Sequence, residues 1–149
     1  MPVEENIHVM RRWFQEVWND SRTQTIYELM APNAIARGQR GAEEDIRGPQ
    51  EFETFVSEIR ASFSDIKLKI EDILGVDDKV VVRWSATMSH TGDLLGLPPS
   101  NKKVRTQGIT IARVTDGKIA EGWDNWDQLG MLEQIGAYKQ PESSLRKSA

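Results

Sequence analysis

The stretch VRTQGITIARVTDGKIAEGWDNWD, residues 104–127, decides the fold of this 149-residue chain. Its Asp-Gly pair at 116–117 is a strong signal of a tight hairpin turn, because both residue types tolerate a positive φ. We therefore predict that the turn joins two neighbouring antiparallel strands. The two predicted strands cover residues 104–114 and 118–124.

Two further strands are predicted upstream of this hairpin. Ile66, Leu68 and Ile70 alternate with charged residues, which is the period-two pattern of a half-buried strand. After an Asp-Asp turn at 77–78, residues 79–90 continue as a long strand that pairs with the previous one. Together the strands predict a meander of long antiparallel strands.

Three helical segments precede the strands, because their apolar residues recur at spacings of three and four. The predicted helices cover residues 4–19, 25–29 and 48–63. Residues 33–47 are rich in Gly, Arg and Glu, and they predict a loop with at most one edge strand. Asp127 is placed to cap a short closing helix that runs through Ile135.

Helices followed by strands indicate an α+β domain. We expect the three N-terminal helices to pack on a strongly curved antiparallel sheet, with a short C-terminal helix at its end. A cone of this kind encloses a cavity that can hold a small ligand. Residues 1–139 are expected to form this single domain, and residues 140–149 a flexible polar tail.

The composition excludes several classes of function. The chain has no cysteine, so it has no thiol catalyst, cysteine-ligated zinc or disulfide. Its two histidines lack metal-ligand spacing, and we expect no metal site. The net charge is −4 without a dense basic run, which disfavours nucleic acid as a partner. No apolar run reaches membrane-spanning length and the N-terminus is acidic, so we expect a soluble cytoplasmic protein that does not enter a membrane.

Asp124 is the main candidate for a catalytic group. It lies between Trp123 and Trp126 at the end of a predicted strand, where indole rings exclude water. A poorly solvated carboxylate has a raised pKa, which suits it to proton transfer near neutral pH. An arbitrary Asp-x-x-Asp more often consists of two solvated turn residues. We interpret Asp124 as the proton carrier and Asp127 as the helix cap.

The strand over 79–90 carries three more candidates. Arg83 either snorkels on the outer face of the sheet or points inward, where it would hold a carboxylate or polarise a carbonyl. Trp84 lies on the opposite face together with His90, the only histidine near the expected pocket. His90 is either a structural hydrogen-bonding residue or part of the catalytic machinery.

Apolar candidates for the cavity wall lie on the first helix and in the loop that precedes residue 104. Trp13 and Trp18 are five residues apart, so they need not share a helix face, and we expect one of them to line the cavity. Leu97 belongs to the apolar run 94–99. This run is either a lid over the ligand or a dimer contact.

Several motifs, in this order, resemble those of the SnoaL-like polyketide cyclases over residues 5–137. The motifs are RWFQEVWN at 12–19, GPQEF at 48–52, HTG at 90–92, GLPP at 96–99, DGKI at 116–119, WDNWD at 123–127 and GMLEQIG at 130–136. Each motif is weak alone, but their order and spacing are specific when taken together.

This resemblance implies the nuclear transport factor 2-like fold, and often a homodimer. It implies that Asp124 is the general acid/base of an aldol cyclisation on a polyketide ester, without cofactor or metal. A pocket histidine of the anthracycline cyclases corresponds to Thr110 in this chain, with Gln107 nearby. Limonene epoxide hydrolases share the fold, but their Arg-x-Asp corresponds here to Arg83-Trp84-Ser85, which lacks the second carboxylate.

The preferred hypothesis is a cofactor-independent enzyme of the cyclase or isomerase type that acts on a small apolar or aromatic carbonyl compound. Asp124 would move a proton at a carbon next to the carbonyl, within a dry wall that includes Trp126. His90, Arg83 or Asn125 would stabilise the enolate oxygen. The alternatives are a non-catalytic small-ligand-binding module of the same fold, and an epoxide hydrolase or dehydratase.

Overall fold

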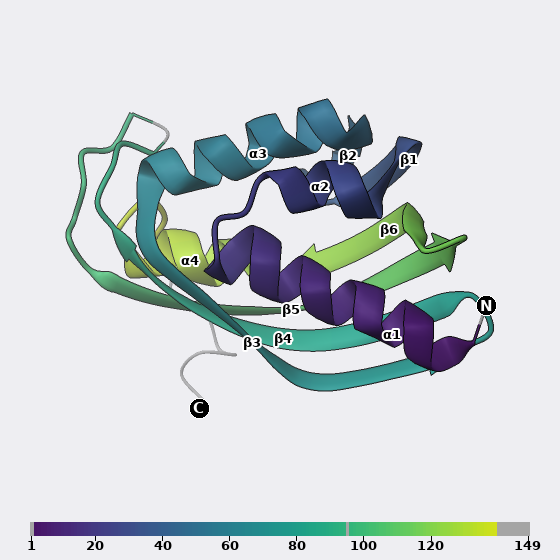
Figure 1. The fold of residues 1–149 in the computed structure, drawn as a ribbon. Coiled ribbons are helices and arrows are strands. Elements are labelled where there is room, and N and C mark those ends of the chain that lie inside the picture. Colours follow the sequence, from purple (N-terminus) through teal and green to yellow (C-terminus); the bar gives the residue numbers. More distant parts are fainter. Residues whose placement is uncertain (1, 95, 140–149) are drawn as a thin grey trace.

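The computed structural model describes residues 2–94 and 96–139, which form one sheet with helices over it (Figure 1). The strands are β1 Met30–Gly38, β2 Gly41–Arg47, β3 Phe63–Val76, β4 Lys79–His90, β5 Lys103–Thr115 and β6 Lys118–Trp126. The helices are α1 Val3–Arg12, η1 Trp13–Asn19, α2 Gln24–Leu29, α3 Gly48–Ser62 and α4 Gln128–Gln134. This arrangement confirms the predicted α+β class.

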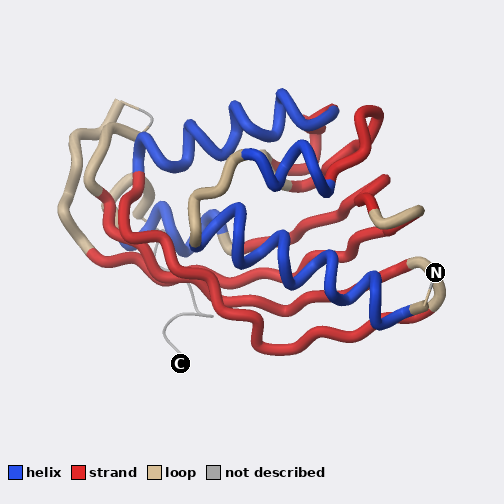
Figure 2. The backbone as a smooth tube through the Cα atoms, viewed as in Figure 1, coloured by secondary structure: helices blue, strands red, loops and turns tan. Residues whose placement is uncertain are grey.

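The sheet has the order β2-β1-β6-β5-β4-β3. The predicted hairpins β3–β4 and β5–β6 are confirmed, and Asp77 and Asp116 in their turns both have a positive φ. However, β1 runs parallel to β6, so the sheet is mixed and the expectation of a wholly antiparallel sheet was wrong. The sheet is also not strongly curled, and helices rather than sheet curvature cover the interior (Figure 2).

The prediction of a loop over residues 33–47 was also wrong, because β1 and β2 form a hairpin there. Gly38 and Gly41, with φ of 85° and 104°, make its tight turn. Sequence patterning missed this hairpin because β2 is an edge strand with mostly exposed side chains, and β1 completes its pairing with β6, far along the chain.

The first predicted helix is confirmed in extent, but its second half has a different geometry. It is α-helical as far as Arg12, and η1 continues it as a π-helix with wider turns. The third predicted helix is α3, which has Pro49 in its first turn. In Figure 1, α1 and α3 lie on the same side of the strands.

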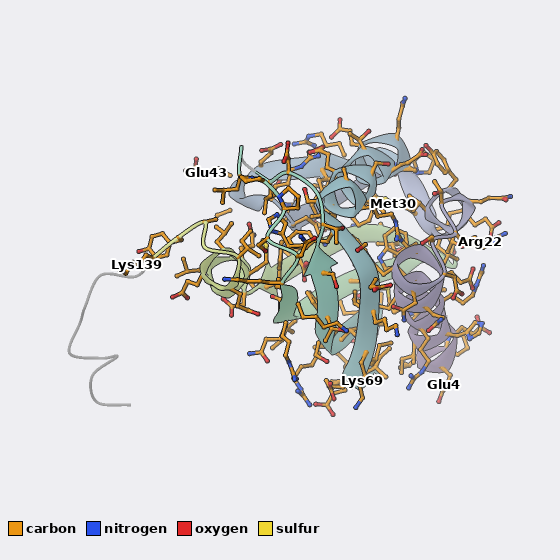
Figure 3. All side chains as sticks on the ribbon, turned by 90° about the vertical axis from the view of Figure 1, so that its left-hand side faces the viewer. Glu4, Arg22, Met30, Glu43, Lys69 and Lys139 are labelled. Carbon is orange, nitrogen blue, oxygen red and sulfur yellow. The ribbon has the colours of Figure 1, made fainter. Side chains whose placement is uncertain are left out.

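The core lies between these helices and the inner face of the sheet. On β4, alternate residues from Val80 to His90 are buried and the residues between them are more exposed, as the period of two predicts. Trp13 and Phe52 meet edge to face with ring centroids 5.0 Å apart, which joins η1 to α3. Figure 3 shows the side chains that fill this interior, with Met30 among them.

The C-terminal part matches the prediction of a capped closing helix. Asp127 precedes α4, and its Oδ1 accepts a hydrogen bond of 2.9 Å from the backbone N–H of Gly130. Gly136 follows the helix with a φ of 81°. The predicted flexible tail over 140–149 lies outside the described residues. None of the helices in the described part of the chain is long and apolar enough to cross a membrane.

Candidate functional site

A cavity of about 650 Å³, its mouth included, lies between the helices and the inner face of the sheet. Much of its wall is apolar, with contributions from Phe14, Trp18, Phe55, Ile59, Phe63 and Met88. The polar part of the wall comes from Gln39, Thr106, Thr110 and Asp124, and from the indoles of Trp84 and Trp126. An apolar pocket with a few convergent polar groups is the usual form of a small-ligand site, so this cavity is the candidate functional site.

Asp124 is only 6% exposed and lies in the polar part of the wall. The register of β5 and β6 places Thr110 directly opposite Asp124. The Thr110 hydroxyl donates a hydrogen bond of 2.6 Å to Oδ1 of Asp124. The Trp84 indole Nε1 in turn donates to Oγ1 of Thr110 at 3.0 Å. The three side chains therefore form a chain of hydrogen bonds that ends on the carboxylate.

Burial raises the pKa of Asp124 from 3.8 to about 6, because an apolar environment disfavours the charged carboxylate. The hydrogen bonds from Thr110 and Trp84 act in the opposite direction and limit this rise in the pKa. At pH 7 most molecules therefore carry the carboxylate form, which can accept a proton. Close to pH 6 the acid form becomes abundant as well, and that form can donate one.

The dry environment predicted for Asp124 is present, but only one of its two neighbouring tryptophans contributes to the cavity wall. Trp126 is two residues away on the strand and therefore shares its face. Trp123 faces the other side, where the guanidinium of Arg37 lies 5.9 Å from the centroid of its ring. Trp84 on β4 supplies the second indole in the wall.

The π-helix η1 brings three aromatic rings into the wall, namely those of Trp13, Phe14 and Trp18. In an α-helix, residues five apart are separated by about 140° around the axis, whereas the wider turn of a π-helix brings them onto one face. Arg60 on α3 supports this segment by donating hydrogen bonds to the backbone carbonyls of Val17 and Trp18. The sequence predicts that one of Trp13 and Trp18 lines the cavity, and both do.

Arg83 and Asn125 lie on the outer face of the sheet, away from the cavity. Arg83 Nε is 2.7 Å from Oδ2 of Asp72, and its side chain is 53% exposed. Asn125 is exposed and lines a groove on the same face. The inward orientation considered for Arg83 was therefore wrong, because strand alternation turns its neighbours Val82 and Trp84 toward the helices instead.

His90 is fully buried against Phe63 but does not belong to the cavity wall. Its Nδ1 accepts a hydrogen bond of 3.1 Å from the backbone N–H of Ser100 and lies 2.9 Å from Oγ of the same residue. Its backbone also bonds to Asn101 and Lys102. His90 therefore anchors the loop between β4 and β5, which is the structural role considered for it.

Leu97 lies in the same loop and is also outside the cavity wall. Its backbone pairs with that of Leu94 through hydrogen bonds of 2.9 and 3.1 Å, so this part of the loop folds back on itself. The loop begins against the end of α3, where the N–H groups of Thr91 and Gly92 donate to the carbonyl of Ser62. Leu97 is therefore held within the loop by backbone contacts and is not among the residues that line the cavity.

Gln39 and Thr106 line the cavity and were missed by reasoning from the sequence. Thr106 is four residues from Thr110 on one strand and therefore shares its face, which is a signal that the sequence contains. Gln39 has no such signal, because its place in the turn between β1 and β2 depends on long-range pairing. Its carbonyl oxygen accepts a hydrogen bond of 3.0 Å from Nε1 of Trp126, which ties the turn to the wall.

The arrangement is suited to proton transfer by a single carboxylate. Among the described residues of the wall, Asp124 is the one with an ionisable side chain, and Thr110 holds one of its two oxygens. The described residues contain no group of three or more His, Cys, Asp or Glu side chains that could hold a metal ion.

Known proteins resemble this chain in sequence and in fold. A family model described as SnoaL-like polyketide cyclase matches residues 8–135. An aklanonic acid methyl ester cyclase of Streptomyces sp. (strain C5) is 27% identical over 132 residues, which cover 87% of this chain and 81% of that protein. A nogalonic acid methyl ester cyclase of Streptomyces nogalater is 28% identical over 123 residues, which cover 80% and 89% of the two chains.

A solved structure from Catenulispora acidiphila, described as having a ketosteroid isomerase-like fold, superposes with a TM-score of 0.73. It is 14% identical and covers 89% of this chain and 97% of its own, so it supports the fold alone. The family model, by contrast, spans every strand and nearly all of the helices, including the segments that carry Asp124, Thr110 and Trp84. The chain belongs to the SnoaL-like polyketide cyclase family.

Proposed function

We propose that this chain is a cofactor-independent enzyme of the cyclase or isomerase type, with Asp124 as general acid and base. Its substrate is a small apolar or aromatic carbonyl compound, such as a polyketide-like ester that closes a ring by an intramolecular aldol reaction. The observation that carries this proposal is a buried carboxylate of raised pKa, held by Thr110 in the wall of an apolar cavity.

The proposed reaction rearranges the substrate without adding or removing atoms. Asp124 takes a proton from a carbon next to a carbonyl group, and the electron pair of that C–H bond moves to the carbonyl oxygen to give an enolate. The enolate carbon then attacks a second carbonyl of the same molecule, which becomes an alkoxide as the carbon–carbon bond forms. The alkoxide takes a proton from Asp124, so the product is an isomer of the substrate.

The cavity wall supports an aromatic or polycyclic substrate. Five aromatic rings from η1, β4 and β6 offer flat apolar surfaces to it, namely those of Trp13, Phe14, Trp18, Trp84 and Trp126. The two relatives named as methyl ester cyclases favour an ester whose neighbouring carbon loses the proton.

Deuterium exchange tests this proposal without the natural substrate. 2-Tetralone is an apolar aromatic ketone whose C1 protons a carboxylate base can remove. In D₂O near neutral pH, the wild-type protein should accelerate the loss of the C1 proton NMR signal over buffer alone, and Asp124→Asn should abolish that acceleration. Asp127→Asn is the matched control, because it changes an exposed carboxylate to another side chain that caps helices well.

Two results would refute the proposal: no acceleration by the wild-type protein, or exchange by Asp124→Asn at the wild-type rate. The same experiment separates the alternatives. A binding module would bind 2-tetralone, as seen from quenched tryptophan fluorescence, without exchange. An epoxide hydrolase needs a second group to activate water, and Ser85, at the position of its second carboxylate, lies on the outer face and donates to Glu71 at 2.7 Å.

We also propose that a second copy of the chain covers the outer face of the sheet. Ile109 is 48% exposed near the middle of that face, and Glu71, Arg83 and Arg105 line the groove beside it. Because a two-fold axis brings each patch against its own copy, acidic and basic groups on the same patch can pair across it. Sedimentation velocity should show a dimer for wild type and a monomer for Ile109→Lys. A wild-type monomer would contradict this assembly.

A further inference from the structure

An enolate formed in the cavity needs a hydrogen-bond donor for its anionic oxygen, and four donor groups in the wall are already engaged within the protein. The Trp84 indole donates to Thr110, and the Thr110 hydroxyl donates to Asp124. The Thr106 hydroxyl donates to the backbone carbonyl of Asp127 at 3.0 Å. The fourth donor, the Trp126 indole, is bound to the carbonyl of residue 39. None of these four groups is free to meet a new anion without breaking a protein hydrogen bond.

Besides the indole N–H groups of Trp13 and Trp18 on η1, Gln39 carries the polar hydrogens in the described wall that no protein hydrogen bond engages. Its side-chain amide has two N–H donors, and the described residues provide no hydrogen-bond partner for that amide. An amide can hydrogen-bond an oxyanion at neutral pH without changing its own charge. It is therefore suited to stabilise the negative charge that develops on the carbonyl oxygen while Asp124 removes the proton from carbon.

The backbone holds Gln39 close to β6, the strand that carries Asp124. Gly38 packs so tightly on β6 that a Cβ added to it would lie 1.8 Å from the backbone carbonyl oxygen of Asp124. The next residue, Gln39, is fixed by the hydrogen bond that its own carbonyl accepts from Trp126. Gly38 and Gly41 bracket the turn with positive φ values, which keeps the turn short.

The structure also removes the donors that the sequence suggested for this oxygen. Arg83 and Asn125 lie on the outer face of the sheet, and Arg83 is paired with Asp72. His90 is bound to Ser100 and lies outside the wall. We propose that the Gln39 side-chain amide donates a hydrogen bond to the carbonyl oxygen of the substrate and holds it as the oxygen becomes an enolate.

This inference rests on the proposed function, in that Asp124 and Gln39 act on one carbonyl compound from two sides. Asp124 takes the proton from carbon, and the Gln39 N–H meets the negative charge that appears on oxygen. A donor that strengthens its bond as charge develops lowers the barrier more than it improves substrate binding. Loss of one such donor typically lowers kcat by about 10²- to 10³-fold.

A stable anion tests this role independently of catalysis. 4-Nitrophenolate resembles an enolate in carrying its charge on an oxygen conjugated with an apolar frame, and its ionised form absorbs visible light. The binding experiment uses Asp124→Asn protein, in which the neutral amide stands for the protonated acid and does not repel the anion. In this background, Gln39→Met should weaken phenolate binding by about 10- to 100-fold. Gln39→Glu, which keeps the shape and adds a negative charge, should weaken it further.

Gln107→Met is the matched control. Gln107 is exposed on the outer face of β5, next to Thr106 in sequence, and its side chain does not reach the cavity. Phenolate affinity of this variant should equal that of the Asp124→Asn parent. Thermal melting of each variant separates a lost donor from a damaged fold, because Gln39 is partly exposed in a surface turn and its substitution should move the melting temperature little.

The kinetic experiment gives a second readout. In otherwise wild-type protein, Gln39→Met should lower kcat for 2-tetralone exchange and leave KM nearly unchanged. If Asp124→Asn abolishes exchange while Gln39→Met leaves kcat intact, the aspartate mechanism stands and the role of Gln39 is excluded. If the wild type gives no exchange, the proposed function fails, and phenolate binding still decides whether Gln39 is the donor. Unchanged phenolate affinity in a folded Gln39→Met protein would overturn the inference.

Discussion

Replacement of Asp124 by Asn should stabilise the protein at neutral pH and leave its stability near pH 4 almost unchanged. The carboxyl has a pKa of about 6 in the folded chain and an ordinary value of 3.8. Between these values the folded state keeps a proton that the unfolded state has lost, so the stability of the wild type falls as the pH rises from about 4 to 6. Asn does not ionise and still accepts the hydrogen bond from Thr110.

The magnitude follows from the difference between the two pKa values. About two pH units at 1.36 kcal/mol per unit correspond to about 3 kcal/mol above pH 6. The side chain is only 6% exposed, so screening by solvent reduces this figure little. A change of 1 kcal/mol moves the melting temperature of a domain of this size by about 3 °C. The Asn variant should therefore melt about 10 °C above the wild type at pH 7.

Urea unfolding followed by tryptophan fluorescence, at several pH values between 4 and 8, measures this difference directly. The gap between Asp124→Asn and wild type should open between pH 4 and pH 6 and stay constant above that range. Asp127→Asn, at the exposed cap of α4, is the control and should show no such opening. A gap that is equal at every pH, or a variant that is less stable at pH 7, would show that burial does not raise this pKa.

Three further substitutions test separate parts of the structure. Thr110→Val should raise the pKa of Asp124 above about 6, because the hydroxyl favours the carboxylate, and the acidic limb of the exchange rate should move up by about one pH unit. Gly38→Ala should lower the free energy of unfolding in urea by several kcal/mol, because its Cβ would meet a carbonyl oxygen at 1.8 Å. Gly117→Ala is the control: its Cβ would lie in open space, so the loss should be about 1–2 kcal/mol. Arg83→Ala should leave the exchange rate unchanged, because Arg83 pairs with Asp72 on the outer face, away from the cavity.

Local patterns in the sequence were enough to predict the hairpins and the main helices. The Asp-Gly turn at 116–117 and the alternation around Leu68 act over a few residues, so their signals survive without knowledge of the rest of the fold. The strands over 33–47 have no such local signal. Their stability comes from the pairing of β1 with β6, for example between Arg37 and Trp123, and sequence alone does not reveal that partner.

The residues of the candidate site also differ in whether a local sequence pattern predicts their position. Asp124, Thr110 and Trp84 all lie on the inner side of long strands, where the period of two fixes which side chains share a face. His90 follows the same period, but the strand ends there and the following loop encloses it. Gln39 could not be predicted, because its place in the wall depends on where the β1–β2 turn meets β6 in three dimensions.

The central position of β6 has a consequence for how the chain reaches its folded state. Among the described strands this one is the last to be synthesised, yet it lies between β1 and β5. On the ribosome, the β1–β2 hairpin must wait with an unpaired edge until β6 has emerged. Such long-range pairing slows folding and leaves open edges vulnerable to aggregation. Because β6 also carries Asp124, the cavity and its carboxylate are assembled together, in the step that closes the sheet.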